Sequence, residues 1–122
     1  MTLRTLLPAT EAQVLDLATA AQASEAGIVS RTVLQTPEVR VILFAFAEGQ
    51  ELTGHRSARR AIIQVLGGNC EFQFNGSWQT LAAGTLLHLP PDHPHAVRAA
   101  HGPFTMLLTL TAEPVAPSTA TA

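Results

Sequence analysis

The sequence predicts one all-β domain, a sandwich or barrel, with a short helix before it. The first observation is the length of 122 residues, which is enough for one domain and too short for two. The second is a series of short apolar runs from Ile28 onward, separated by turn residues at regular intervals, as in all-β sandwiches and barrels. The third is a single stretch of helical periodicity near the start of the chain.

The helical pattern precedes residue 28. Thr10 and Gln13 fit a capping box, in which each side chain bonds to the backbone amide of the other residue. Apolar residues recur at helical spacing from Val14, and Gly27 is a suitable stop. We therefore expect residues 1–27 to form a short helical segment that packs on the larger body.

The strand pattern continues to about residue 113. Asn75 and Gly76 form the strongest hairpin signal, because a type I′ turn needs a positive φ at both central residues. The small, proline-bearing residues 114–122 are expected to be disordered. The expected strands are residues 33–35, 39–47, 61–66, 70–74, 78–81, 86–89, 96–99 and 104–111.

The composition and charge of the chain exclude several classes of function. Hydrophobic residues make up 47% of the chain, charged residues 13%, and the net charge is −2, so there is no basic footprint for nucleic acid or for an acidic membrane surface. Cys70 is the single cysteine, which excludes an intrachain disulfide. The longest apolar run, residues 41–47, is too short to cross a bilayer, and the first residues lack a secretory signal. A cytoplasmic protein is expected.

In the middle of the chain, Gly49, His55 and Gly68 follow one another with five and twelve residues between them. At this spacing they resemble the first glycine, the first histidine and the last glycine of the first signature motif of the cupin superfamily, G-x5-H-x-H-x3,4-E-x6-G. Ser57 replaces its second histidine, and Ala61 replaces its glutamate.

A later segment resembles the second cupin motif, G-x5-P-x-G-x2-H-x3-N. Gly84, Pro90 and His95 match the glycine, proline and histidine of that motif at the same spacing. Asp92 and Ala99 depart from its second glycine and its asparagine. The resemblance implies that residues 28–113 form a double-stranded β-helix, the jelly-roll barrel of the cupins.

In cupins, two histidines and a glutamate of the first motif and one histidine of the second usually hold a divalent metal. Alternation along a strand supplies the geometry, since residues two apart share one face. The resemblance leaves His55 and His95 as metal ligands, with His93 as a further candidate. Since two imidazoles bind a metal weakly, the expected cofactor is none, or Zn, Ni, Mn or Fe at low occupancy.

We expect the barrel cavity to bind a small molecule and to be lined by five polar residues. His55 and His95 belong there by their motif positions, and Ser57 replaces a ligand that faces the cavity. Arg59 shares the face of His55 if strand alternation extends back from residue 61, although a solvated loop charge is the alternative. His88 ends a strand near the barrel mouth, with simple packing as its alternative.

Three functional interpretations stay open. The favoured one is a small cupin that binds a small molecule without a complete metal centre. The first alternative is a metal-dependent enzyme, an oxygenase or isomerase, that uses His55 and His95. The second is a structural or partner-binding module whose cavity is filled by side chains. Fold alone does not select a reaction, so the sequence leaves open whether the protein is an enzyme.

A homodimer is also expected. Residues 39–47 are apolar on both alternating faces, and one barrel interior covers only one of them. Ile42, Phe44 and Phe46 share a face, and we expect at least one of them at or beneath a two-fold interface between barrels.

Overall fold

The computed structural model describes residues 5–113; of Gly54 and His55 it describes the backbone only. The predicted tail at residues 114–122 therefore lies outside the described residues. Strands dominate the described chain, which confirms the predicted all-β class. In chain order the elements are α1 (Leu17–Ala20), β1 (Ile28–Gln35), β2 (Val39–Phe46), β3 (Glu51–His55), β4 (Arg60–Gly67), β5 (Asn69–Phe74), β6 (Ser77–Ala82), β7 (Leu86–Leu89), β8 (His95–Arg98) and β9 (Phe104–Thr111).

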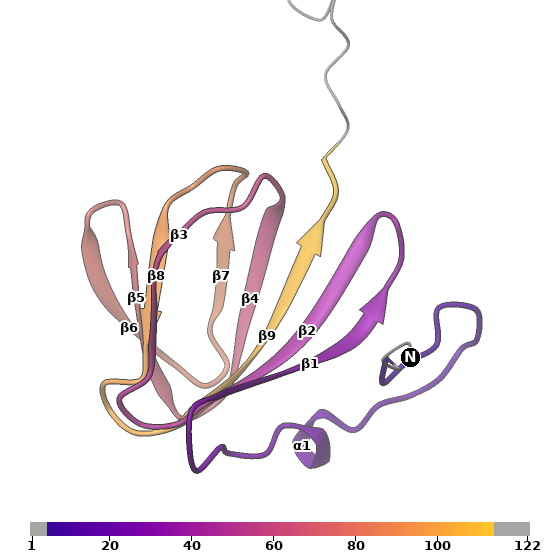
Figure 1. Cartoon of the computed structure of the whole chain (residues 1–122), viewed down its shortest axis with the longest axis horizontal. Coiled ribbons are helices and arrows are strands. Elements are labelled where there is room, and N and C mark those ends of the chain that lie inside the picture. The colour runs from indigo at the N-terminus through magenta and orange to yellow at the C-terminus, as the bar shows by residue number, and fades with distance from the viewer. Residues whose placement is uncertain (1–4, 114–122) are drawn as a thin grey trace, which may run out of the picture.

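The strands form two antiparallel sheets that face each other (Figure 1). One sheet has the order β1-β2-β9-β4-β7 and the other has the order β3-β8-β5-β6. Strands that are distant in sequence are neighbours in both sheets, for example β2 with β9 and β3 with β8. This crossed connectivity is that of a jelly-roll barrel, as the cupin resemblance implied.

The core lies between the two sheets and is built around aromatic rings. Phe46, Phe72 and Phe104 are almost completely buried. The rings of Phe46 and Phe104 stack with their centres 4.6 Å apart. Burying each such side chain stabilises the fold by about 1.5–3 kcal/mol, so this cluster holds the sheets together.

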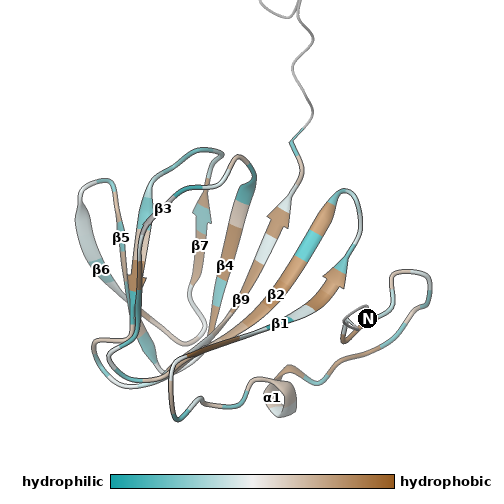
Figure 2. Ribbon diagram, viewed as in Figure 1, coloured by the Kyte–Doolittle hydropathy of each residue, from teal (hydrophilic) through white to brown (hydrophobic). Residues whose placement is uncertain are grey.

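Apart from Arg40, strand β2 is apolar at every position, as the sequence indicated, and its ribbon is mostly brown in Figure 2. Phe44 and Phe46 belong to the face that packs on the barrel core, and Phe46 is fully buried there. Ile42 is on the same face by alternation, so all three side chains face the interior of their own barrel. The expected place of at least one of them at or beneath a dimer interface stays a prediction. Leu43 and Ala45 are on the outer face and are also buried. Part of the N-terminal segment lies against them, so the chain covers this stretch itself.

The predicted short helix is present, but it is shorter and starts later than expected. It spans Leu17–Ala20, and the carboxylate of Asp16 caps it by accepting a hydrogen bond from the Ala18 amide at 3.0 Å. Thr10 is not a cap, and Val14 is 97% exposed. A weakly amphipathic stretch buries too little apolar surface to offset the cost of starting a longer helix. No helix of the described residues is long and apolar enough to cross a membrane.

One strand was missed. Strand β3 reads Glu-Leu-Thr-Gly-His, and its single large apolar residue gives no alternating pattern. It forms because Leu52 pairs with Val97 of β8 and packs against the core.

Two positions with a positive φ have a clear structural reason. Asn75 and Gly76 have φ angles of 53° and 83°, which confirms the predicted type I′ hairpin signal. Gly68, a motif glycine, has a φ of 74°, and a Cβ atom there would lie 2.5 Å from the carbonyl oxygen of Pro103. Only glycine fits both the backbone angle and this close approach.

Candidate functional site

The two motif histidines meet at one end of the four-stranded sheet. In the ladder between β3 and β8, His55 pairs directly with His95, so their Cα atoms are about 4.5–5.5 Å apart. The register shifts between Leu52 and His55, where β3 contains one extra residue. The side chain of His55 lies outside the described part of the structure, so the site is built from His95 outward.

His95 is half-buried and begins β8, directly after the loop that ends in Pro94. Its Nδ1 lies 3.0 Å from the carbonyl oxygen of His93. A carbonyl only accepts, so Nδ1 carries the hydrogen, and the neutral ring then has its lone pair on Nε2. The ring also stacks on Phe72, with the centres 6.4 Å apart. These two contacts fix both the orientation and the tautomer of the imidazole.

A small cavity of about 70 Å³ lies inside the barrel beside His95. Both sheets contribute to its wall, and among the described residues that line it only His95 is a hydrogen-bonding side chain. The lining residues are Phe44, Leu52, Ile63, Phe72, His95, Val97, Met106 and Leu108. The barrel interior is therefore a compact apolar chamber with one imidazole in its wall.

A larger groove of about 450 Å³ lies on the other side of His95. The β5–β6 turn forms one wall, and the loop before β8 forms the other. It is lined by Gln73, Phe74, Asn75, Gly76, His93, Pro94 and His95. His95 is common to the chamber and the groove, and His93, a predicted metal candidate, faces the groove instead. The sequence identified Asn75 only as a turn residue and did not single out Gln73, because neither belongs to a motif.

A backbone contact joins the two motif loops beside this site. The amide of Asp92 donates to the carbonyl oxygen of Ser57 across 2.6 Å. Asp92 has a φ of 62°, so it takes the left-handed conformation for which the motif uses glycine. Aspartate tolerates this conformation better than most residues, which explains how the departure is accommodated. The hydroxyl of Ser57 accepts from the Arg59 amide at 3.1 Å, so it serves the loop, and Ser57 lines neither space.

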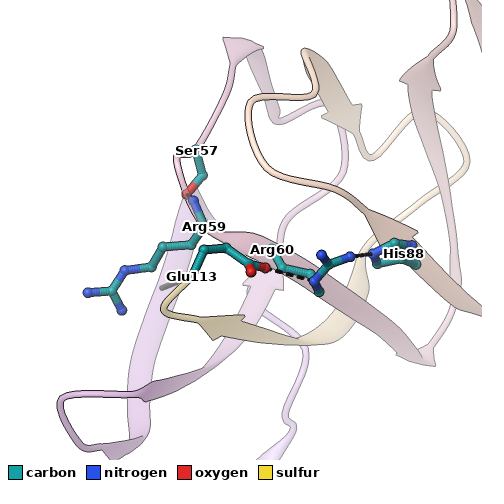
Figure 3. Close-up of polar contacts among 5 residues, drawn as sticks. All are labelled: Ser57, Arg59, Arg60, His88 and Glu113. Carbon is teal, nitrogen blue, oxygen red and sulfur yellow. Dashed lines mark hydrogen bonds and ion pairs between the residues drawn. The ribbon is translucent and has the colours of Figure 1, made fainter. Parts of the chain in front are cut away.

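Two other predicted cavity residues lie elsewhere (Figure 3). His88 is exposed on the outer face of β7, since its neighbours Leu87 and Leu89 occupy the buried face. Its Nε2 lies 2.7 Å from an Nη1 of Arg60, whose Nε donates to Glu113 at 2.8 Å.

The side chain of Arg59 extends away from this trio and lines neither the chamber nor the groove. Residue 59 precedes β4, so strand alternation does not carry Arg59 to the face of His55.

The metal-ligand set of the cupins does not fit the residues at these positions. Ala61 places a methyl group in the apolar core where the motif has glutamate. Ser57 presents a neutral hydroxyl that already accepts a backbone hydrogen bond. The described residues contain no group of three His, Cys, Asp or Glu side chains close enough to hold an ion.

Other reactive groups lie away from the site. Burial raises the pKa of the Cys70 thiol to about 12, so it is a protonated core residue. On the outer face of the four-stranded sheet, Arg98 donates to Glu71 at 2.7 Å and lies 3.8 Å from the centre of the Trp78 ring. The hydrogen bond from Arg98 lowers the pKa of Glu71, and His101 adds a second contact at 3.3 Å.

The fold and the site together define a cupin-type ligand-binding barrel, with a chamber and a groove joined at one histidine. A family model for the AraC-like ligand-binding domain matches residues 41–116, which include both motif segments and the whole site. The chain belongs to this family of ligand-binding domains.

Solved structures support the same assignment. A conserved protein of unknown function from Streptococcus pyogenes is similar with a TM-score of 0.77 and 26% identity, over 94% of this chain and 100% of that one. A cupin superfamily protein from Desulfitobacterium hafniense has a TM-score of 0.75 and 25% identity, over 86% and 95% of the two chains. A cupin barrel protein from Leptotrichia buccalis has a TM-score of 0.75 and 30% identity, over 80% of this chain and 47% of that one. No curated protein matches the chain significantly.

Proposed function

We propose that the His95 end of the barrel binds an uncharged small molecule that extends from the inner chamber into the groove. The observation that carries this proposal is that one side chain, His95, lines both spaces. A ligand that reaches through this point places its apolar end among core side chains and its polar body between the two loops. The family of ligand-binding domains to which the chain belongs supports this interpretation.

The chamber defines the apolar end of the ligand. Its volume of about 70 Å³ equals about two water volumes, enough for a short branched alkyl group. Each methylene that enters this lining is worth about 0.8 kcal/mol. A larger ring would have to displace core side chains.

The groove defines the polar body. Gln73, Asn75 and His93 supply hydrogen-bonding groups, and the described residues that line the two spaces include no Arg, Asp or Glu. A charged ligand would lose its hydration without gaining a counter-ion, so an uncharged body with hydroxyl or amide groups fits better. The His95 imidazole adds a polar group at the point where the two spaces meet.

The test titrates isobutanol and isobutyramide, separately, into the protein. NMR spectra record the chemical shifts of the backbone amides and of the imidazole nitrogens. We expect the largest shifts at residues 73–76 and 93–95. His95→Leu should weaken binding about tenfold or more, which corresponds to about 1.4 kcal/mol. His101→Leu, at an exposed histidine on the outside of the barrel, is the matched control and should bind as the wild type does. Absence of shifts at the groove, or equal effects of both variants, would overturn the proposal.

We also infer that two copies pair through the outer face of the five-stranded sheet. The N-terminal segment covers this face only around Leu43 and Ala45. Further along the same face, Val41, Ile62 and Leu107 are only partly buried. Leu86 on the edge strand β7 is 64% exposed. A second copy would cover these apolar side chains, with about 1,600 Å² or more buried in a stable assembly.

Light scattering at micromolar concentration tests the dimer. The wild type should have twice the mass of the monomer, and Ile62→Glu with Leu86→Glu should reduce it to one chain. Thr80→Glu, on the exposed side of β6 in the other sheet, is the control and should keep the dimer. A monomeric wild type would contradict the inference.

Two expectations from the sequence stay predictions. The cytoplasmic location is one, and cell fractionation with an antibody to the protein tests it. A divalent metal at low occupancy is the other, and metal analysis of protein purified without a histidine tag tests it. A full equivalent of metal would favour the alternative of a metal-dependent enzyme.

A further inference from the structure

A third cavity lies outside the barrel, on the far side of β2 from the chamber. Its volume is about 290 Å³, near the lower limit of about 300 Å³ for small-molecule sites. Residues 19–24, which include the end of α1, form one wall. The outer face of β1 and β2 forms the other wall. Figure 1 shows α1 beside β1, outside the space between the two sheets.

The floor of this cavity is apolar. Leu43 and Ala45, 4% and 9% exposed, are already covered by the chain, and Val29 from β1 leaves 47% of its area exposed beside them. Val29 is therefore the part of this apolar surface that an apolar group of a ligand can contact.

Arg31 supplies the charge. It lies on β1 and pairs with Leu43 across the ladder, so both residues belong to the cavity face. Within the described residues, the Arg31 side chain has no hydrogen bond or ion pair, and no Asp or Glu lines the cavity. By contrast, Arg60 and Arg98 each bond to a glutamate.

The polar groups of the wall are already engaged. The amide nitrogen of Gln22 donates to the Thr19 carbonyl at 3.2 Å, and the Ser24 hydroxyl donates to the Ala26 carbonyl at 2.8 Å. The hydroxyl of Thr19 donates to Asp16 at 3.0 Å. Arg31, in the opposite wall, is thus the lining residue that offers strong donors to an anion.

We propose that this cavity is a second ligand site, for a small monocarboxylate with a compact apolar body. The guanidinium of Arg31 matches a carboxylate with two parallel hydrogen bonds. The apolar body would rest on Val29. The cavity volume admits one ring or a branched alkyl group, so benzoate is of suitable size. This site differs from the barrel site in place and in ligand charge, and it does not depend on the proposed function.

Benzoate titrations followed by NMR test whether this cavity binds a carboxylate. We expect shifts at residues 19–24 and at Val29, Arg31 and Leu43. Arg31→Gln should weaken benzoate binding about tenfold or more, and Arg31→Lys should weaken it less, because charge is kept but the two-pronged geometry is lost. Uncharged benzamide should bind the wild type about tenfold more weakly than benzoate does. Arg56→Gln removes the same charge from an exposed position outside the three cavities and should leave binding unchanged.

Three outcomes would overturn the proposal. The first is no saturable benzoate binding. The second is binding that survives Arg31→Gln and is lost in His95→Leu, which would place benzoate in the barrel. The third is equal weakening by Arg31→Gln and Arg56→Gln, which would show general charge attraction only.

Discussion

The backbone amide of Asp92 and the carbonyl oxygen of Ser57 are 2.6 Å apart, so one hydrogen bond joins the loop after β3 to the loop before β8. These loops carry the two cupin motifs, and both reach the end of the barrel where His95 lies. Asp92 makes this contact in a left-handed conformation, with a φ of 62°. A residue outside the binding spaces thus links the two loops that reach the site.

The stability of variants at Asp92 should follow how readily the new residue adopts a positive φ. Asp92→Gly should keep or slightly raise the free energy of unfolding, because glycine adopts a positive φ without steric cost. Asp92→Val should lower it by about 1–3 kcal/mol, the cost of a left-handed conformation in a β-branched residue. Urea unfolding measures both values, with Thr80→Val on the exposed side of β6 as the control. Equal stability of the glycine and valine variants would show that the conformation costs nothing.

Gly68 and Gly84 provide a matched pair. Both have a positive φ, of 74° and 92°, but only at Gly68 would a Cβ atom meet backbone, at 2.5 Å from the Pro103 carbonyl. Gly84→Ala should therefore cost about 1 kcal/mol, whereas Gly68→Ala should cost about 3 kcal/mol or more. Thermal and urea unfolding measure the difference, and equal losses would contradict the role given to the close approach.

Metal ions should have little effect on stability. Excess Zn²⁺, Ni²⁺ or Mn²⁺ should leave the melting temperature of the wild type almost unchanged, because Ala61 and Ser57 offer no adequate ligand. His55→Ala should then melt at nearly the same temperature with and without metal. A large metal-dependent rise that His55→Ala abolishes would show that a tight site exists after all.

Acid should remove one identifiable contribution to stability. The hydrogen bond from Arg98 lowers the pKa of Glu71 below its usual value of 4.5. The folded state therefore binds this proton more weakly than the unfolded chain, so the contact stabilises the fold above about pH 4.5 and is lost as the pH falls through the lower folded-state pKa.

Urea unfolding of Glu71→Gln from pH 7 to pH 3 measures this effect. The variant should lose stability less steeply below about pH 4.5 than the wild type. Glu25→Gln, in the exposed turn before β1, is the control and should follow the wild type. An identical slope for Glu71→Gln and the wild type would rule out this contribution.

Much of the fold could be predicted from the sequence because alternation and turn residues are local signals. The strands after residue 60 were placed within one residue of their ends, and the Asn75-Gly76 turn has the expected conformation. Strand β3 could not be predicted in this way, since its pairing with β8 depends on contacts across 40 residues of chain. The helix was overestimated because a capping pattern at Thr10 says nothing of how much surface the following turns can bury.

The site was predictable only in part. The motif spacing assigned His55 and His95 to one cavity, and the structure pairs the two residues across the β3–β8 ladder. It could not place His88, because the face of a short strand such as β7 depends on which neighbours are buried. Gln73 and Asn75 were missed since they reach the groove through the approach of the β5–β6 turn to the loop before β8.

The ladder between β2 and β9 runs through eight paired residues without a shift, whereas β1–β2, β3–β8 and β4–β9 each contain an irregularity. Because side chains alternate with a period of two, a slip of one residue here would turn Phe44 and Phe46 outward and bring Leu43 and Ala45 into the barrel. It would thus destroy the inner chamber and the outer cavity together. A single-residue insertion or deletion in β2 or β9 should therefore be far less tolerated than one at the existing bulges of β1 or β3.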